Sequence, residues 1–169
     1  VVGHEMTHGF DDQGRKYDSE GNMRDWWVGN DGPEYEARAQ AMIKQSEKFE
    51  VYGVALKGKL TQGENIADLG GLKLALRALK AHLALTKVAE DSLINGFTPV
   101  QRFFLAWSQA WRENVKKERA LQLVTLDPHG PNELRCNQPL SNMEEFCDAF
   151  NIVEGDVMWK ERDTRVDIW

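Results

Sequence analysis

Apolar residues recur at helical spacing through most of the chain, and this pattern predicts a mainly α-helical structure. The clearest stripe lies in residues 63–86, where leucines and one isoleucine follow one another at intervals of three or four positions. A second periodic segment follows Pro33, a residue favoured in the first turn of a helix, and extends to about residue 56. Because little of the sequence alternates between apolar and polar residues, we expect helices rather than a sheet.

Capping signals give the expected helix boundaries. A Ser or Thr followed three residues later by Glu or Gln forms a capping box, and the pattern occurs at Thr61, Thr98 and Ser141. It predicts helices over about 63–86, over 99–117 and from Ser141 to Phe150. We also expect a helix end at 1–9, a short helix near 118–125, and irregular structure at 10–32, 87–97, 127–132 and 151–169.

Two features of the long helix qualify this pattern. Gly58 and Gly63 are predicted to separate it from the preceding helix. Gly70 and Gly71 lie inside it, where each Gly costs about 1 kcal/mol relative to Ala. Such a pair predicts that another backbone passes close to the helix.

Composition restricts the class of protein. A chain of 169 residues with 41% hydrophobic and 28% charged residues is long enough for one domain with a substantial core. The net charge of −6 and the lack of a basic stripe argue against nucleic acid as a partner. No run of apolar residues is long enough to span a bilayer.

Cys136 and Cys147 have no zinc-ribbon spacing, and we expect two free thiols, with a disulfide as the alternative.

The strongest chemical signal is an H-E-x-x-H motif at His4, Glu5 and His8. On a helix, residues four apart share a face, so both histidines can bind one Zn²⁺ ion. Glu5 then lies beside the metal without binding it, which is where a general base for an activated water is required.

A catalytic zinc needs a third protein ligand. The metzincin pattern would place a histidine at position 14, which is Gly14. Glu64 is a better candidate, with Asp68 one helical turn later to accept the distal N–H of a ligand histidine. A solvated acidic first turn is the alternative for this pair, and the upstream motif favours the metal site.

The segments VVGHEMTHGFDD, GENIADLGG and DPHGPNELR, in this order, resemble the neprilysin and endothelin-converting enzyme family of zinc metallopeptidases, M13. The resemblance extends over the chain and implies the helical C-terminal portion of a zincin-type, thermolysin-like (gluzincin) catalytic domain. It implies one Zn²⁺ per chain, with His4, His8 and Glu64 as ligands. It also implies Glu5 as general base and Asp68 as the carboxylate that orients a ligand histidine.

The same resemblance implies roles for residues that local patterns do not single out. His129 matches a histidine that stabilises the oxyanion, and Asp127 matches its orienting carboxylate. Arg135 matches an arginine that binds a substrate carbonyl. Asp11 is a candidate partner for His8. The apolar pocket for the residue after the scissile bond is implied at Val1, Ala110 and Trp111.

Some features of the family are missing from this sequence. The upstream Asn-Ala-x-Tyr edge is absent, and Ile152 and Val166 stand where vertebrate members have cysteines. We therefore expect residues 1–169 to be a single domain that forms the C-terminal part of a longer bacterial protein. The N-terminal part of that protein is then its partner. We expect a monomer, in the periplasm, at the cell surface or secreted.

The sequence thus predicts a zinc endopeptidase that cleaves oligopeptides on the amino side of bulky hydrophobic residues. Two alternatives stay open. The chain alone could be a non-catalytic zinc-binding fragment, or it could be a helical binding domain with a degenerate motif.

Overall fold

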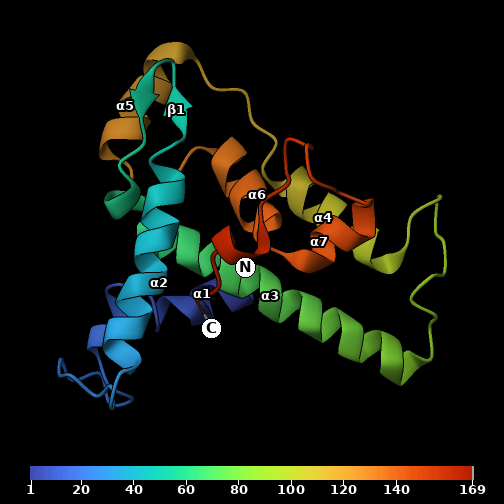
Figure 1. The fold of residues 1–169 in the computed structure, drawn as a ribbon, viewed down its shortest axis with the longest axis horizontal. Coiled ribbons are helices and arrows are strands. Elements are labelled where there is room, and N and C mark those ends of the chain that lie inside the picture. The colour runs from blue at the N-terminus through green and yellow to red at the C-terminus, as the bar shows by residue number, and fades with distance from the viewer. Residues whose placement is uncertain (169) are drawn as a thin grey trace.

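A computed structural model describes residues 1–168, and its helices are arranged around one long central helix (Figure 1). This helix, α3, covers Gly58–Thr86. It packs against α1 (Val2–His8), α2 (Asp31–Ser46) and α6 (Asn132–Ser141). Helices α4 (Pro99–Ala110) and α7 (Glu144–Phe150) pack on each other and on α6. The prediction of a mainly α fold is confirmed.

The remaining elements are short. Helix α5 (Lys117–Leu126) packs on a hairpin of β1 (Glu50–Val51) and β2 (Val54–Ala55), and together they form the projection at the top left of Figure 1. Two 3-10 turns, η1 (Gly14–Lys16) and η2 (Arg162–Thr164), complete the described part of the chain. The strands pair antiparallel, with Glu50 opposite Ala55 and Val51 opposite Val54.

The main core joins α2, α3, α4 and the C-terminal helices. Its most deeply buried members are Met42, Ile66, Leu69, Leu76, Phe104 and Met143. Burial of each such side chain contributes about 1.5–3 kcal/mol relative to exposure. A smaller cluster of Leu56, Val124 and Leu134 fixes the hairpin and α5 to α6. The core therefore holds α3 in place, and α3 in turn supports α1.

Helix α1 lies directly on α3 because glycines remove the side chains between them. A Cβ atom on Gly71 would lie 2.5 Å from the backbone nitrogen of His4, and one on Gly3 would lie 2.9 Å from the carbonyl oxygen of Gly71. Thr7 packs against Gly70 in the same way. A helix of seven residues is too short to be stable alone. The close approach predicted from the glycine pair is confirmed, and it gives α1 its geometry.

We expect the substitution Gly71→Ala to lower the free energy of unfolding by about 1–3 kcal/mol, because a new Cβ would meet backbone that cannot rotate away. Helix α1 would have to move off α3, so zinc affinity should fall as well. Gly9→Ala is a matched control, since its Cβ would find only an ordinary contact, 3.4 Å from the Met6 oxygen. Urea unfolding and zinc titration of both variants make the comparison. Equal stability of the two variants would contradict this account of the interface.

The predicted helix over 33–56 is too long. Helix α2 ends at Ser46, and the chain then forms the hairpin. Tyr52 and Gly53 form its two-residue turn with φ values of 51° and 81°. Turns with two positive φ values match the twist of paired strands. The apolar residues Phe49 and Val54, which resemble a continued helical stripe, belong to the hairpin region instead.

The predicted start of the long helix is also wrong. Helix α3 begins at Gly58, and Thr61 lies within it, where its hydroxyl donates to the Gly58 carbonyl oxygen rather than capping the helix. Gly58 stands at a helix boundary as predicted, but Gly63 lies inside α3 and is not a break. A Cβ at Gly58 would lie 2.4 Å from the carbonyl oxygen of Ile43, and one at Gly63 would lie 3.1 Å from Oδ2 of Asp11. Both glycines are sites of close approach.

The C-terminal half differs from the predictions in one whole helix. The capping box at Thr98 is confirmed, but α4 ends at Ala110 rather than at 117. Helix α6 was not among the predicted elements. Pro139 lies in its last turn, where it cannot donate to the Arg135 carbonyl oxygen, and the helix ends two residues later at Ser141. Helix α7 begins without a side-chain cap, so the predicted capping box at Ser141 is wrong.

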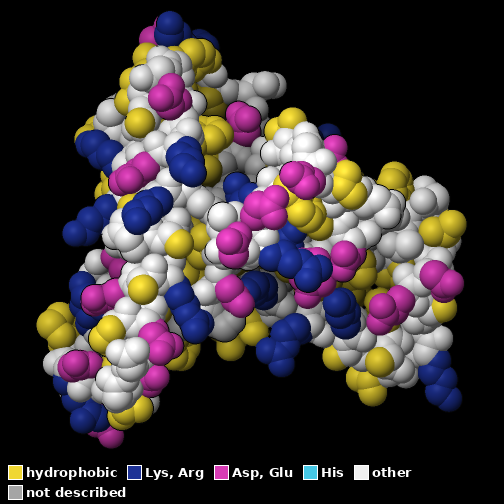
Figure 2. All heavy atoms as spheres, viewed as in Figure 1, with side chains coloured by type: hydrophobic (Ala, Val, Ile, Leu, Met, Phe, Trp, Pro, Cys, Tyr) yellow, Lys and Arg dark blue, Asp and Glu magenta, His cyan; other side chains and the backbone are white. Residues whose placement is uncertain are grey.

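Other features of the described residues bear on the class of protein. None of their helices has the length and apolar character needed to cross a membrane. Cys136 and Cys147 are both free thiols, as expected. The face shown in Figure 2 carries interspersed acidic and basic side chains, and no histidine is visible on it.

Candidate metal centre and active site

Helices α1 and α3 bring three candidate ligands to one point. Nε2 of His4 lies 3.1 Å from Nε2 of His8 and 3.2 Å from Oε2 of Glu64. Nε2 of His8 lies 3.5 Å from the other Glu64 oxygen. Among the described residues, these three form the group whose ligand atoms could hold one metal ion. The predicted ligands are therefore brought together by the fold.

The spacing of these atoms fits a tetrahedral zinc ion. Ligands about 2.0–2.1 Å from zinc at tetrahedral angles lie about 3.3 Å from one another. The three separations between His4, His8 and Glu64 scatter around that value. Two imidazoles and one carboxylate form the ligand set of a catalytic zinc site that keeps a fourth position open.

Each histidine is oriented by a carboxylate at its other ring nitrogen. Nδ1 of His4 lies 2.9 Å from Oδ1 of Asp68, and Nδ1 of His8 lies 2.7 Å from Oδ2 of Asp11. A carboxylate accepts a hydrogen bond, so Nδ1 carries the proton and the Nε2 lone pair is left for a metal. Two lone pairs and the Glu64 carboxylate then face one another, an arrangement that a cation stabilises.

The loop after α1 positions Asp11. Its Oδ1 atom accepts hydrogen bonds from the backbone N–H groups of Gln13 and Gly14, both at 2.8 Å. Its Oδ2 atom is left for His8, and the side chain is buried against α3 beside Gly63. Asp11 thus lies in the place that its predicted role requires.

Asp68 is shared between His4 and Arg135. The carboxylate is only 2% exposed and accepts hydrogen bonds from Nε of Arg135 at 2.8 Å and from Nη2 at 3.0 Å. Nη2 also donates to Glu64 at 3.1 Å. A paired guanidinium offsets the cost of burying these carboxylates close together. The Arg135 guanidinium lies 4.4 Å above the ring of Trp111, which fixes its plane.

Asp68 also changes the protonation of His4. The hydrogen bond from Nδ1 to Asp68 raises the pKa of His4 above its usual value, while burial of the ring opposes the shift. The negative charges of Asp68 and Glu64 act in the same direction as the hydrogen bond. Protons therefore compete with a metal for His4 at a higher pH than they would for an isolated histidine.

His129 approaches the ligands from the loop between α5 and α6. Its Nδ1 atom lies 2.8 Å from Oδ1 of Asp127, and its Nε2 atom lies 3.4 Å from Oε1 of Glu64. The Asp127 carboxyl is partly buried, which acts to raise its pKa. Hydrogen bonds from the backbone and ring of His129 outweigh this effect and hold the pKa below its usual range. Asp127 thus aims the ring at the metal centre.

A pocket of about 640 Å³ adjoins the three ligands. Glu5 is exposed at its edge, and its carboxylate has no hydrogen-bond partner within residues 1–168. Val1, Ala110 and Trp111 are among the residues that line the pocket. Sequence analysis missed five further apolar lining residues: Leu72, Ala75, Phe103, Ala106 and Trp107. The spacing of the α4 residues, three or four positions apart, was a usable signal that they share one face.

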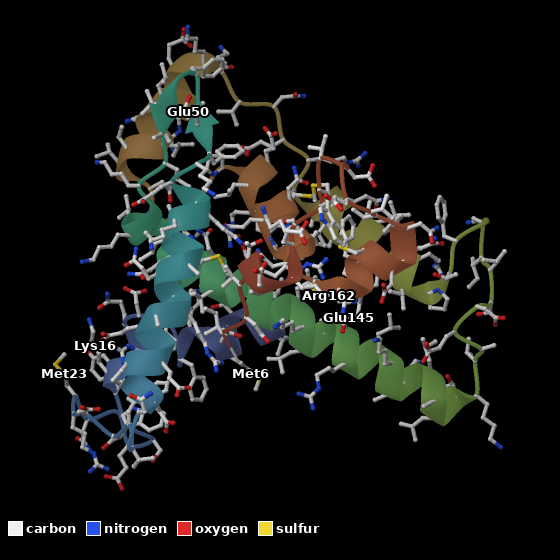
Figure 3. All side chains as sticks on the ribbon, in the orientation of Figure 1. Met6, Lys16, Met23, Glu50, Glu145 and Arg162 are labelled. Atoms are coloured by element: carbon white, nitrogen blue, oxygen red, sulfur yellow. The ribbon has the colours of Figure 1, made fainter. Side chains whose placement is uncertain are left out.

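A second groove lies on the other side of α1. It has a volume of about 960 Å³ and is lined by Met6, Phe10 and Leu74, with Glu145 and Arg162 among its charged residues (Figure 3). None of the three candidate ligands contributes to it. The larger groove is therefore separate from the candidate chemistry.

Comparison with known proteins gives a consistent result. The sequence model of Peptidase family M13 matches residues 1–166 of this chain. Neprilysin-1 of Caenorhabditis elegans is 41% identical over 162 residues, which cover 94% of this chain and 22% of the relative. Endothelin-converting enzyme 1 of Homo sapiens is 41% identical over 159 residues, covering 94% of this chain and 20% of the relative.

A solved structure supports the same relationship. The chain resembles the zinc metalloprotease Zmp1 of Mycobacterium tuberculosis in complex with an inhibitor, with a TM-score of 0.94 and 40% identity. The match covers 100% of this chain and 26% of that protein. The chain spans about a quarter or less of the length of these relatives. From the match across nearly all of its residues, we conclude that the chain belongs to peptidase family M13.

Proposed function

We propose that the protein containing this chain is a zinc endopeptidase that hydrolyses peptide bonds in oligopeptides. The observation that supports it best is the convergence of His4, His8 and Glu64 beside an apolar pocket, with Glu5 at the edge of that pocket. Membership of family M13 and relatives named as zinc metalloproteases support the same class of activity.

The proposed cofactor is one Zn²⁺ ion held by His4, His8 and Glu64. Bound zinc would lower the pKa of a water molecule and polarise the carbonyl of the scissile bond. Asp68 and Asp11 would keep both rings in the tautomer that presents Nε2 to the metal.

We assign the proton transfers to Glu5. Its carboxylate would accept a proton from the attacking water and deliver it to the nitrogen of the leaving amine. His129 would stabilise the transition state. When its ring is protonated on both nitrogens, Nδ1–H donates to Asp127 and Nε2–H is available for the developing oxyanion.

The pocket supports a preference for large apolar side chains. The apolar part of its lining comes mainly from α4, through Phe103, Ala106, Trp107 and Ala110, and from Trp111 directly after that helix. We propose that it holds the residue on the carboxyl side of the cleaved bond, so that cleavage occurs on the amino side of bulky hydrophobic residues. Arg135, at the boundary of the pocket, would donate to a substrate carbonyl with a guanidinium that Asp68 and Trp111 keep in place.

A panel of quenched fluorescent peptides tests the proposal. Peptides that differ only at the residue after the scissile bond should be cleaved with kcat/KM about 10–200-fold higher for Phe or Leu than for Ala, as the size of an apolar pocket allows. A chelator should abolish cleavage, and added Zn²⁺ should restore it. Cleavage that persists in the chelator would contradict the metal mechanism, and indifference to the varied residue would contradict the role of the pocket.

A second candidate function concerns the chain by itself. Since it spans about a quarter or less of its relatives, residues 1–169 alone could bind zinc without hydrolysing peptides. We propose that these residues form a single structural unit, which is one part of the catalytic domain of the whole protein. The rest of the polypeptide is then their partner. The same peptide assay with the chain and with the whole polypeptide distinguishes the two functions. A bacterial origin, a location outside the cytoplasm and a monomeric state remain predictions.

A further inference from the structure

A buried polar junction lies where α2, α3 and α6 meet. Ser46 of α2, Thr61 and Asn65 of α3, and Gln138 of α6 are each no more than 8% exposed. None of these four side chains takes part in the metal centre described above. Buried polar groups are costly unless they are hydrogen-bonded, so such a cluster requires an explanation.

Ser46 is the centre of the hydrogen bonds in this junction. Nδ2 of Asn65 donates to Oγ of Ser46 at 2.9 Å, and Nε2 of Gln138 donates to the same oxygen at 3.0 Å. The Ser46 hydroxyl donates to the carbonyl oxygen of Met42 at 2.9 Å. Asn65 also donates to Oγ1 of Thr61 at 3.1 Å. One hydroxyl therefore links three helices.

The junction adjoins the candidate active site through sequence neighbours. Asn65 follows the ligand Glu64 directly and precedes Asp68 by three residues. Gln138 follows Arg135 by three residues, so both lie on the same side of α6. Helix α6 is therefore attached to α3 at two levels, by Arg135 at Asp68 and by Gln138 through Ser46.

The side-chain oxygen of Asn65 lies beside the loop that carries His129. Oδ1 is buried and has no hydrogen-bond partner among residues 1–168. A Cβ atom on Gly130, which follows His129, would lie 3.6 Å from this oxygen. The amide of Asn65 thus lies between the helix that carries Glu64 and the loop that carries His129.

We propose that Asn65 is a positioning residue for the metal centre. Apolar contacts allow a helix to slide or turn slightly, but the Asn65 amide, held by Thr61 of its own helix, must also meet the buried Ser46 hydroxyl of α2. This bond holds α3 at one rotation relative to α2. That rotation places Glu64 opposite His4 and His8, and places Asp68 opposite Arg135. The proposal rests on the proposed zinc site, and it adds a residue that does not contact the metal.

The test is Asn65→Ala in the whole polypeptide, with measurements that do not depend on activity. Loss of a group that orients a ligand typically weakens metal binding by about 10–100-fold, and we expect about tenfold here. We also expect the visible absorption bands of the Co²⁺-substituted protein to shift, because Co²⁺ spectra report the geometry of the ligands. Both measurements are made well below the midpoint of thermal unfolding.

Asn142→Ala is the matched control. Asn142 is also a buried amide, and it exchanges two hydrogen bonds of 2.9 Å with Gln45 and accepts one of 2.8 Å from the backbone of Val166. It also donates one of 2.8 Å to the backbone carbonyl oxygen of Gln138, and this bond does not involve the Gln138 side chain that meets Ser46. Its loss should destabilise the fold by a similar mechanism, but none of these contacts involves a proposed ligand or its partners. We expect a lower thermal midpoint with unchanged Zn²⁺ affinity and an unchanged Co²⁺ spectrum.

The outcomes distinguish failure of the proposed zinc site from failure of the positioning role of Asn65. Wild-type protein that binds neither Zn²⁺ nor Co²⁺ would overturn the metal site and this inference with it. Wild-type binding together with unchanged affinity and spectrum in Asn65→Ala would overturn the positioning role alone. If Asn65→Ala does not fold, Ser46→Ala removes the shared hydroxyl from α2 without changing α3, and an unaltered Co²⁺ spectrum in that variant would overturn the proposal.

Discussion

Glu5→Gln is expected to retain zinc and to hydrolyse peptides about 10²–10⁴-fold more slowly, because a positioned general base usually contributes a rate factor of this size. Glu5 is on α1 between the two ligand histidines, but it is exposed and takes no part in the group of ligand atoms. The amide has nearly the shape of the carboxylate and cannot accept a proton. The expected loss is therefore in kcat, with little change in KM. Steady-state kinetics and metal analysis of the same preparation measure both quantities.

The control for this prediction is Glu90→Gln, on the exposed loop between α3 and α4. It makes the same chemical change outside the site, and we expect activity within about twofold of the unchanged protein, as for most surface substitutions. Full activity in Glu5→Gln would exclude Glu5 as the base. Loss of zinc in that variant would show instead that Glu5 supports the metal, and the loss of hydrolysis could no longer be assigned to proton transfer.

Short-range geometry predicts the two pairs in the candidate site, whereas joining Glu64 to the histidines rested on their chemistry and on the family resemblance. The spacing of His4 and His8 places both on one face of α1, and the spacing of Glu64 and Asp68 does the same on α3. The glycines at 70 and 71 predicted that another backbone would approach this helix, and α1 is that neighbour. These inferences need only the helical period and the size of a missing side chain.

Long-range contacts could not be obtained in this way. Nothing local shows that Arg135 pairs with Asp68 or that Trp111 lies under its guanidinium. His129 has no helical pattern around it, and its place was expected only from the family resemblance. Its position beside Glu64 depends on Asp127 and on the loop that follows α5.

Errors in the elements have a common physical cause. Gly63 was interpreted as a break, although it lies inside α3 and allows the loop that carries Asp11 to pack closely on it. Helix α6 was missed altogether, although a proline, Pro139, is accommodated in its last turn. In each case tertiary packing outweighs the local preference, and the sequence alone does not show what packs there.

Glu64→Gln is expected to weaken zinc binding by about 10²–10⁴-fold. Zinc held by several protein ligands is bound with about 10–16 kcal/mol, so that removal of one of three ligands costs about 3–5 kcal/mol. In Gln the amide oxygen is a poorer ligand, and the amide nitrogen would face either the imidazoles or Arg135. Glu64 contacts all of these groups, with 3.1 Å to Nη2 of Arg135. Competition with a chromophoric chelator measures the affinity.

Glu5→Gln is the matched control for this second variant, because it changes the other glutamate of the site in the same way. If the assignments hold, the two variants separate binding from chemistry: Glu5→Gln keeps the metal without hydrolysis, and Glu64→Gln regains part of its hydrolysis when excess Zn²⁺ refills the site. Zinc affinity within about threefold of the unchanged protein in Glu64→Gln would remove Glu64 from the ligand set. Asp68 could not replace it, since both of its oxygens are already used by His4 and Arg135.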